Sequence, residues 1–265
     1  MIDRYQQLFD TNKSKSGILV PFFMLGDFSE TETLEWVDML IENGANALEL
    51  GMPFSDPVAD GPVIQKAAIK ALARGTNPDV CFKLITAIRK KHPLVPMGLL
   101  TYANLVVVKG IKEFYAQAQQ SGLDSILLAD IPVHAIEVFK TMSHKYGIHQ
   151  VLIATPNATE QQIEKIAKKS SGYTYVVSRS GVTGTDLKSG LPTDTLKRIK
   201  SFQAPPALLG FGISQKQDVV NAMVAGFDGV ICGSALVHIQ HQYDNKERLI
   251  KGAQLMQLLK RGLID

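Results

Sequence analysis

Short apolar runs alternate with amphipathic stretches from one end of the chain to the other. The runs read GILVPFFML, NALELG, PMGLLTY, SILLAD, HQVLIAT, TYVVSR, PALLGFG and GVICGS, and their length and β-forming residues are typical of buried strands. Between them lie stretches with apolar residues at helical spacing, for example residues 31–44 and 111–122. The pattern predicts about eight strand–helix units in succession.

Eight such units in 265 residues suit a closed barrel, which typically takes about 250 residues. A doubly wound open sheet is the alternative, because it is built from the same units. That fold usually carries a glycine fingerprint at its first strand–helix turn, and here the turn reads MLGDFSE. We therefore predict an α/β protein of the (β/α)8 TIM barrel class. We expect a single domain over residues 1–265, with an extra N-terminal helix in MIDRYQQLFDTNKSKSG.

Three helix–strand junctions repeat one motif. ENGANALEL, QSGLDSILL and VAGFDGVIC each place a glycine at the end of a helix, followed by one linking residue, Asn or Asp, and a strand. The glycine suits a left-handed helix cap, and the short polar residue suits a tight turn. We interpret these junctions as the side of the repeat that serves stability rather than chemistry.

Composition narrows the class of function. The chain is 45% hydrophobic and 20% charged, and its formal charge of +3 is scattered rather than gathered in a basic run. We expect no nucleic acid and no membrane as partners, and a small anionic substrate instead. The two cysteines, Cys81 and Cys232, lie far apart, and no apolar run reaches the ~18 residues of a membrane span. The sequence thus favours a soluble cytoplasmic protein.

Two loops after predicted strands exceed the usual length of about two to six residues. One runs from Gly51 to Gly61 and the other from Arg179 to Leu191. Loops that follow strands lie on the catalytic face of a barrel, so we expect these two to form walls or lids of a site.

Glu49 lies in the strand that precedes the first long loop. It shares parity with Ala45 and Ala47, whereas Leu48 and Leu50 alternate with it. With the leucines against the helices, Glu49 would point into the barrel mouth. Burial there would raise its pKa and let it both donate and accept a proton. An ion pair with a Lys or Arg is the structural alternative.

Asp60 lies at the far end of the same loop, before Pro62, which is suited to the first position of a helix. A capping or turn role is the structural alternative for Asp60, and a turn role is the default for Asp56. Two carboxylates on either side of one active-face loop, however, are the layout that divides acid and base roles by environment. We therefore take Glu49 and Asp60 as the candidate catalytic pair.

Glycines at the ends of the last two predicted strands indicate a phosphate site. LLGFGIS and GVICGSAL each place Gly before a residue able to start a helix, where barrels present backbone N–H groups to a phosphate. We predict a cup of Gly212, Gly233 and Ser234, closed over by Gly184. Residues near other strand ends are ordinary core singly but together could line an apolar pocket: Phe22, Leu100, Leu127, Ala129, Ile153 and Tyr175.

Motifs for other chemistries are weak or missing in the sequence. Of six histidines, only His238 and His241 have a helical spacing, and no Cys or carboxylate completes a ligand set, so we expect no metal. Neither a G-x-S-x-G nor a Walker-type loop occurs. Acyl transfer and NTP hydrolysis therefore have no support.

Four segments together resemble one enzyme family. LELGMPFSDPVADGPVIQ, SRSGVTG, GFGIS and GSALV are similar to the tryptophan synthase alpha chain, in the family's order and spacing, and the resemblance covers essentially the whole chain. It implies a barrel that cleaves indole-3-glycerol phosphate to indole and glyceraldehyde 3-phosphate by a retro-aldol reaction, with no cofactor of its own. It also implies a beta chain as partner in an alpha2beta2 heterotetramer, which condenses indole with serine on pyridoxal phosphate.

The resemblance also implies roles for particular residues. Glu49 would shuttle the protons of the glycerol hydroxyl and of indole C3, while Asp60 would hold the indole N–H and stabilise charge developing on the ring. The family's substrate-pocket positions fall on Phe22, Leu100, Leu127, Ala129, Ile153, Tyr175, Thr183, Phe211 and Ile231. Its phosphate positions fall on Gly184, Gly212, Gly233 and Ser234, and its beta-chain contacts on Asp56, Pro57, Asn104 and Pro132.

Two other functions are alternatives at this point. A different phosphate-binding barrel of aromatic biosynthesis would need a catalytic Lys or Cys at a strand end, where this sequence offers Glu49, Asp130 and Arg179. A catalytically inert chain that only activates a beta chain is the other, and the presence of both Glu49 and Asp60 argues against it.

Overall fold

The computed structural model of the chain describes residues 2–12, 17–178 and 190–263. Eight parallel strands form a closed barrel in chain order, with β1 paired to β8. They are β1 (Ile18–Met24), β2 (Leu48–Gly51), β3 (Met97–Thr101), β4 (Ser125–Leu128), β5 (His149–Ala154), β6 (Thr174–Val176), β7 (Ala207–Leu209) and β8 (Gly229–Cys232). The predicted (β/α)8 class is confirmed, and every strand lies within the apolar run that predicted it.

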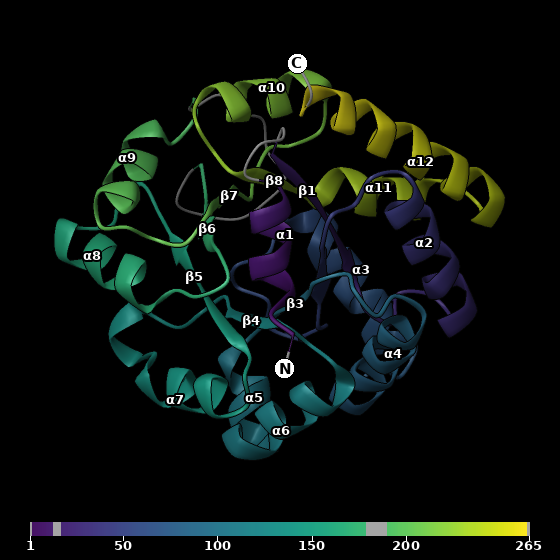
Figure 1. Cartoon of the computed structure of the whole chain (residues 1–265). Coiled ribbons are helices and arrows are strands. Elements are labelled where there is room, and N and C mark those ends of the chain that lie inside the picture. Colours follow the sequence, from purple (N-terminus) through teal and green to yellow (C-terminus); the bar gives the residue numbers. More distant parts are fainter. Residues whose placement is uncertain (1, 13–16, 179–189, 264–265) are drawn as a thin grey trace.

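Helices form a ring around the strands, apart from α1, which lies inside the ring in the centre of the view (Figure 1). They are α1 (Arg4–Asn12), α2 (Glu30–Glu42), α3 (Pro62–Ala73), α4 (Pro78–Lys91), α5 (Ala103–Lys109), α6 (Ile111–Ser121), the 3-10 turn η1 (Val133–Ala135), α7 (Glu137–Lys145), α8 (Glu160–Lys169), α9 (Thr193–Ser201), α10 (Lys216–Val224), α11 (Ser234–Gln242) and α12 (Asn245–Gly262). Because each strand is followed by helix, the chain returns over the outside and neighbouring strands run parallel. Across the described residues, no helix combines the length and hydropathy that crossing a membrane requires.

Local signals set where several helices begin and end. Ser29 and Glu32 form a capping box at the start of α2, in which the side chain of each accepts the backbone N–H of the other. Pro62 is the first residue of α3, as predicted. At the end of α6, Gly122 adopts the left-handed conformation that only glycine enters without strain.

The repeated helix–strand junction ties neighbouring strands together. Its glycines all have positive φ, as predicted: 108° at Gly44, 86° at Gly122 and 93° at Gly226. In each copy the polar side chain two positions later accepts, at 2.8 Å, a backbone N–H of the preceding strand: Leu19 to Asn46, Met97 to Asp124 and Ala207 to Asp228. The junction therefore fixes the register of strand pairs at the amino end of the barrel.

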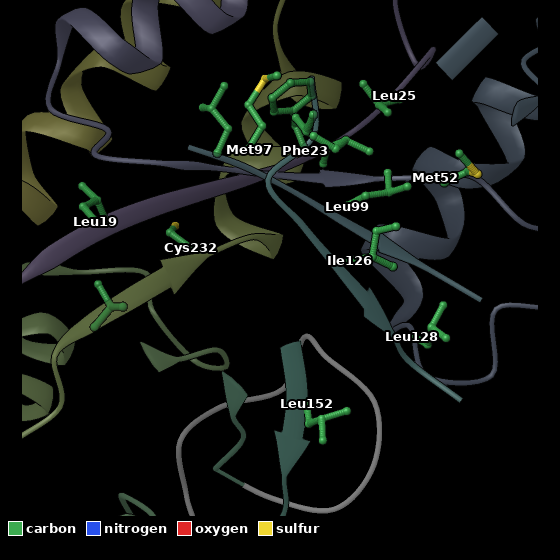
Figure 2. Packing of buried hydrophobic residues seen from close by; sticks show 14 of the residues in the cluster. Leu19, Phe23, Leu25, Met52, Met97, Leu99, Ile126, Leu128, Leu152 and Cys232 are labelled. Carbon is green, nitrogen blue, oxygen red and sulfur yellow. The ribbon is translucent and has the colours of Figure 1, made fainter. Parts of the chain in front are cut away.

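Strand side chains alternate between two hydrophobic clusters. One cluster lies between the strands and the helices, and Figure 2 shows part of it, including Leu19 of β1, Leu99 of β3 and Cys232 of β8. The other cluster fills the barrel and contains the alternate positions, such as Val20 of β1 and Ile231 of β8. The barrel is thus packed along its axis and open only where the inward residues end.

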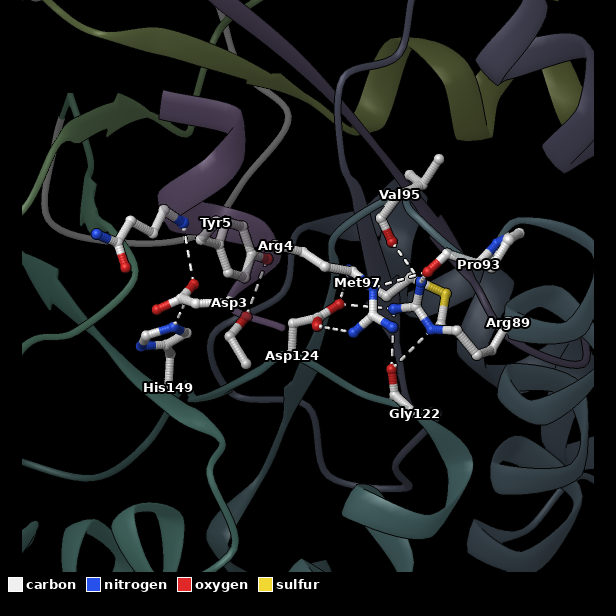
Figure 3. A network of polar contacts seen from close by, with 12 residues as sticks. Asp3, Arg4, Tyr5, Arg89, Pro93, Val95, Met97, Gly122, Asp124 and His149 are labelled. Atoms are coloured by element: carbon white, nitrogen blue, oxygen red, sulfur yellow. Dashed lines mark hydrogen bonds and ion pairs between the residues drawn. The ribbon is translucent and has the colours of Figure 1, made fainter. Parts of the chain in front are cut away.

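Helix α1 closes the amino end of the barrel, which confirms the predicted extra helix. The buried Tyr5 hydroxyl hydrogen-bonds Ser125 Oγ at the start of β4, at 3.0 Å. Asp124, one residue earlier, pairs with Arg4 at 2.8 Å and with Arg89 of α4 at 2.6 Å. Figure 3 shows the contacts that join its carboxylate to both guanidinium groups. The buried charge of Asp124 is therefore compensated by two partly buried charges of opposite sign.

Candidate active site

A cavity of about 680 Å³ opens at the carboxyl ends of the strands. Each of the eight strands, or a position within two residues of its end, contributes at least one side chain to the wall, including Phe22, Glu49, Leu100, Ala129, Ile153, Tyr175, Phe211 and Ile231. Asp60 lines the same cavity from the loop after β2. Active sites of barrels lie at this end, and the structure brings both candidate carboxylates and most of the predicted apolar residues together there.

Leu127 is placed apart from the other predicted pocket residues. It is packed in the barrel interior, one layer below Ala129 on the same side of β4, and does not line the cavity. Side chains on one side of a strand are stacked in layers, and only the last reaches the mouth. Thr183 and Gly184, predicted for the pocket and the phosphate cup, lie outside the described residues.

Glu49 is directed into the barrel by the alternation of β2. Leu48 and Leu50 pack in the outer cluster, whereas Ala47 packs in the inner one, as predicted. Ala45 departs from the prediction, since it packs against the outer cluster. The reason is that β2 begins only at Leu48, so strand alternation does not extend back to Ala45.

The Glu49 carboxylate is buried, with 2% of the residue exposed. It accepts a hydrogen bond from the Tyr173 hydroxyl at 2.9 Å, and no cation of the described residues pairs with it, contrary to the ion-pair alternative. Burial raises the pKa of Glu49 to about 7, and the bond from Tyr173 opposes this only in part. A carboxyl group with a pKa near neutrality can both donate and accept a proton.

Asp60 is 7% exposed and differs from Glu49 in its partner. The N-cap of α3 is Gly61, so the capping alternative for Asp60 is wrong, whereas its backbone N–H does close a turn onto the Pro57 carbonyl at 3.0 Å. Its carboxylate is hydrogen-bonded by the Tyr102 hydroxyl, which in turn accepts the Ala59 N–H at 3.2 Å. Burial raises the pKa of Asp60 to about 6, below that of Glu49. In both groups burial thus favours the protonated form, and the carboxyl group of Glu49 is the more strongly affected.

Gly212, Gly233 and Ser234 line the same cavity on the side of β7 and β8. Gly233 is the N-cap of α11, and no side chain of the described residues caps the first N–H groups of this helix. The N-terminus of α10 differs, because the Asp218 carboxylate accepts the N–H groups of Ser214 and Gln215 at 2.9 and 3.0 Å. An anion entering the cavity therefore finds its backbone donors at α11.

The four residues predicted to contact a partner lie on the same end of the barrel as the cavity. Asp56 and Pro57 are in the loop after β2, Asn104 is in α5 after β3, and Pro132 precedes η1 after β4. Asp56, Asn104 and Pro132 are exposed, and Pro57 is half-buried. All four therefore lie in the segments that follow three consecutive strands, β2, β3 and β4, and together they are called the rim below.

Sequence reasoning missed the partners of the two carboxylates. Tyr173 is 124 positions from Glu49, and no local pattern connects them. Tyr102 could have been predicted as a site residue, because it directly follows β3 and carries a hydroxyl group at the carboxyl end of a strand. Nothing in the described ranges groups three or more His, Cys, Asp or Glu side chains as a metal site would.

The model of the tryptophan synthase alpha chain family matches residues 8–262. The chain belongs to this family. The tryptophan synthase alpha chain of Photobacterium profundum is 49% identical over 240 residues, which cover 90% of this chain and 89% of the relative. That of Shewanella baltica is 49% identical over 250 residues, covering 93% and 92%.

Solved structures of the family have the same fold. Tryptophan synthase subunit alpha from Legionella pneumophila superposes with a TM-score of 0.90 at 28% identity, over 99% of both chains. A chain of the tryptophan synthase a2b2 complex from Pyrococcus furiosus superposes with a TM-score of 0.84 at 32% identity, over 93% of this chain and 99% of that one. Membership therefore rests on sequence and on fold together.

Proposed function

We propose that the chain cleaves indole-3-glycerol phosphate to indole and glyceraldehyde 3-phosphate, the retro-aldol half of tryptophan synthesis. One observation carries the proposal. Two buried carboxylates whose pKa values are both raised by burial, Glu49 and Asp60, line one cavity with the N-terminus of α11. The apolar wall suits the indole ring, the carboxylates suit its reacting atoms, and the helix N-terminus suits the phosphate.

The reaction we propose begins with Glu49 in its acid form. Glu49 gives its proton to indole C3, which makes the ring an electron-poor indolenine. The Asp60 carboxylate accepts a hydrogen bond from the ring N–H and stabilises the charge that develops there. The Glu49 carboxylate then takes the proton of the adjacent glycerol hydroxyl as the carbon–carbon bond breaks. The bond electrons return to the ring, so indole leaves, the hydroxyl carbon becomes the aldehyde, and Glu49 regains its proton.

The environments of the two acids support this division of roles. A pKa of about 7 suits Glu49 to carry the proton, and a pKa of about 6 leaves Asp60 mostly ionised at neutral pH. Burial keeps the pKa of Tyr173 well above its ordinary value, so its hydroxyl stays a donor to Glu49 throughout. The described residues that line the cavity include no Lys and no Cys, which disfavours the alternative barrel chemistry.

We further propose that the chain works with a beta chain, as in the a2b2 complex of the Pyrococcus furiosus relative. The rim formed by Asp56, Pro57, Asn104 and Pro132 lies at the same end of the barrel as the cavity, and three of its four residues are exposed to such a partner. Indole would then pass to the partner without entering water. Both cysteines are buried and unpaired, in keeping with the reducing cytoplasm as the site of the reaction.

The test is indole release from indole-3-glycerol phosphate by the purified full-length chain, with and without a beta chain. We expect slow release by the chain alone and much faster release with the partner. If neither condition yields indole, while a known alpha chain does so in the same assay, the proposed function is wrong.

A further inference from the structure

Most of the charged side chains that line the cavity, which receives the phosphate in the proposed function, are acidic. Glu49, Asp60 and Asp218 line it, and of the described lining residues only His238 can carry a positive charge. A phosphate monoester brings a charge between about −1.5 and −2 at neutral pH. Next to three carboxyl groups, such an anion is held more firmly if a side chain offers an opposing charge or a strong donor.

His238 is built into the helix whose N-terminus faces the phosphate. It lies in α11 four positions after Ser234, so the two residues share one face of the helix, a single turn apart. Helical side chains lean toward the N-terminus of their helix. The imidazole of His238 is therefore directed back toward Ser234 and Gly233, and all three line the cavity.

A second histidine on the same helix shows what a structural role looks like there. His241 pairs with the buried carboxylate of Asp27, and its ring meets Phe28 edge-on with the centroids 6.2 Å apart. His238, by contrast, is exposed and has no hydrogen bond or ion pair with any described residue. Its ring nitrogens are thus available to a molecule in the cavity.

We propose that His238 is a substrate-binding residue that donates an N–H to the phosphate and adds to the backbone donors of α11. Neutral imidazole has one N–H donor and imidazolium has two, so the contact exists in either form. The N-terminus of α10 has fewer backbone donors available to the phosphate, because the Asp218 carboxylate already accepts the N–H groups of Ser214 and Gln215. The inference rests on the proposed function for the identity of the substrate, but the phosphate contact can be measured without turnover.

The experiment compares three full-length variants with the parent chain. His238→Ala removes the donor, His238→Lys restores a cation at the same position, and Gln242→Ala alters an exposed side chain on the same helix outside the cavity. Two quantities are measured for each: the KM and kcat for indole-3-glycerol phosphate, and the dissociation constant of inorganic phosphate by calorimetry. Indole, which lacks the phosphate, is titrated in parallel.

For His238→Ala we expect KM and the phosphate dissociation constant to rise together by about three- to tenfold, as for loss of one partly exposed charge-assisted hydrogen bond. Indole affinity and kcat should change much less, His238→Lys should recover most of the loss, and Gln242→Ala should match the parent. A phosphate dissociation constant unchanged in His238→Ala would overturn the proposal. So would an equal loss of indole affinity, because that pattern indicates a merely structural role.

The two proposals fail in different ways. If the parent chain binds phosphate but releases no indole, the proposed function is wrong, and the binding series still decides the role of His238. If the parent chain turns over substrate and His238→Ala has the parent's KM, the reaction stands and the role of His238 is wrong.

Discussion

The buried carboxylates at the two ends of the barrel differ in their hydrogen-bonding and ion-pair partners. At the amino end, the Asp124 carboxylate is held by Arg4 and Arg89 and by the backbone N–H of Met97. At the carboxyl end, Glu49 and Asp60 are as deeply buried, yet each is held by a tyrosine hydroxyl and by no cation of the described residues.

This difference separates stability from chemistry within one fold. A buried carboxylate between two guanidinium groups is compensated, so it stabilises the folded chain without taking part in proton transfer. A buried carboxylate without a cation raises the energy of its own ionised form, which costs stability but brings its pKa to where a proton can be exchanged. Changes at the two ends should therefore act on different measurements.

The largest effect is expected at the carboxyl end. Glu49→Gln keeps the shape of the side chain but cannot exchange a proton, so kcat for indole release should fall by about 10²–10⁴. Binding of indole-3-glycerol phosphate, measured by calorimetry, should change little. A Gln variant with nearly full activity would exclude the proton shuttle.

The opposite result is expected at the amino end. Asp124→Ala leaves two guanidinium groups without their shared partner, and such a loss from a buried network costs about 3–5 kcal/mol. Unfolding in urea should show this drop, while the activity per folded molecule should stay close to that of the parent. Asp79→Ala is the control, because its pair with Lys109 is exposed and should hardly affect stability. A stable Asp124→Ala variant with impaired catalysis would break the contrast between the two ends.

The stability cost at the carboxyl end can be seen through pH. The pKa of Glu49 is raised from its ordinary 4.5 to about 7, so its contribution to stability is present below pH 4.5 and is lost as the pH rises through 7. Glu49→Gln removes this pH-dependent loss of stability, because Gln does not ionise. The variant should exceed the parent in unfolding free energy at pH 8 by up to about 3 kcal/mol, and the gain should shrink toward pH 4.5. A pH-independent difference would mean that burial does not perturb Glu49.

The smallest expected effect concerns the hydroxyl that holds Asp60. The bond from Tyr102 lowers the pKa of Asp60, so Tyr102→Phe should raise it further above 6. Because Asp60 acts ionised, the acidic limb of the kcat/KM profile should move to higher pH, with a loss of about threefold near neutrality. Tyr146→Phe, remote from the cavity, should leave the limb unchanged. If the acidic limb of the profile does not move in Tyr102→Phe, the ionisation of Asp60 is not what determines that limb.

Most of the fold could be predicted because its signals are local. Eight apolar runs, glycine caps such as Gly122 and the proline at the start of α3 are each read within a few residues. Ala45 shows the limit, since a strand boundary depends on which neighbour the backbone pairs with. The helices beyond the basic repeat, such as α5 and α12, follow from packing that periodicity alone does not specify.

In the site, too, local sequence signals could be interpreted, whereas contacts between distant parts of the chain could not. Glu49 and Asp60 could be located from strand parity and from one loop, and their family resemblance assigned the roles. Their hydroxyl partners could not, because Tyr173 and Tyr102 reach them only after the barrel closes. Leu127 shows a related gap, since parity gives the side of a strand but not the depth of a residue along the barrel axis.

Helix α1 has a consequence for the order in which the molecule is assembled. Asp3, Arg4 and Tyr5, at its start, hydrogen-bond Pro93, Asp124, Ser125 and His149, which lie 89 to 146 positions downstream. The first helix to leave the ribosome therefore cannot complete these contacts until β4 and β5, near the middle of the chain, have been synthesised. Tyr5 also packs against Tyr173, with ring centroids 5.5 Å apart, and Tyr173 holds Glu49. The floor beneath the reacting carboxylate can thus be completed only after Tyr173 has been synthesised, although it includes the first residues of the chain.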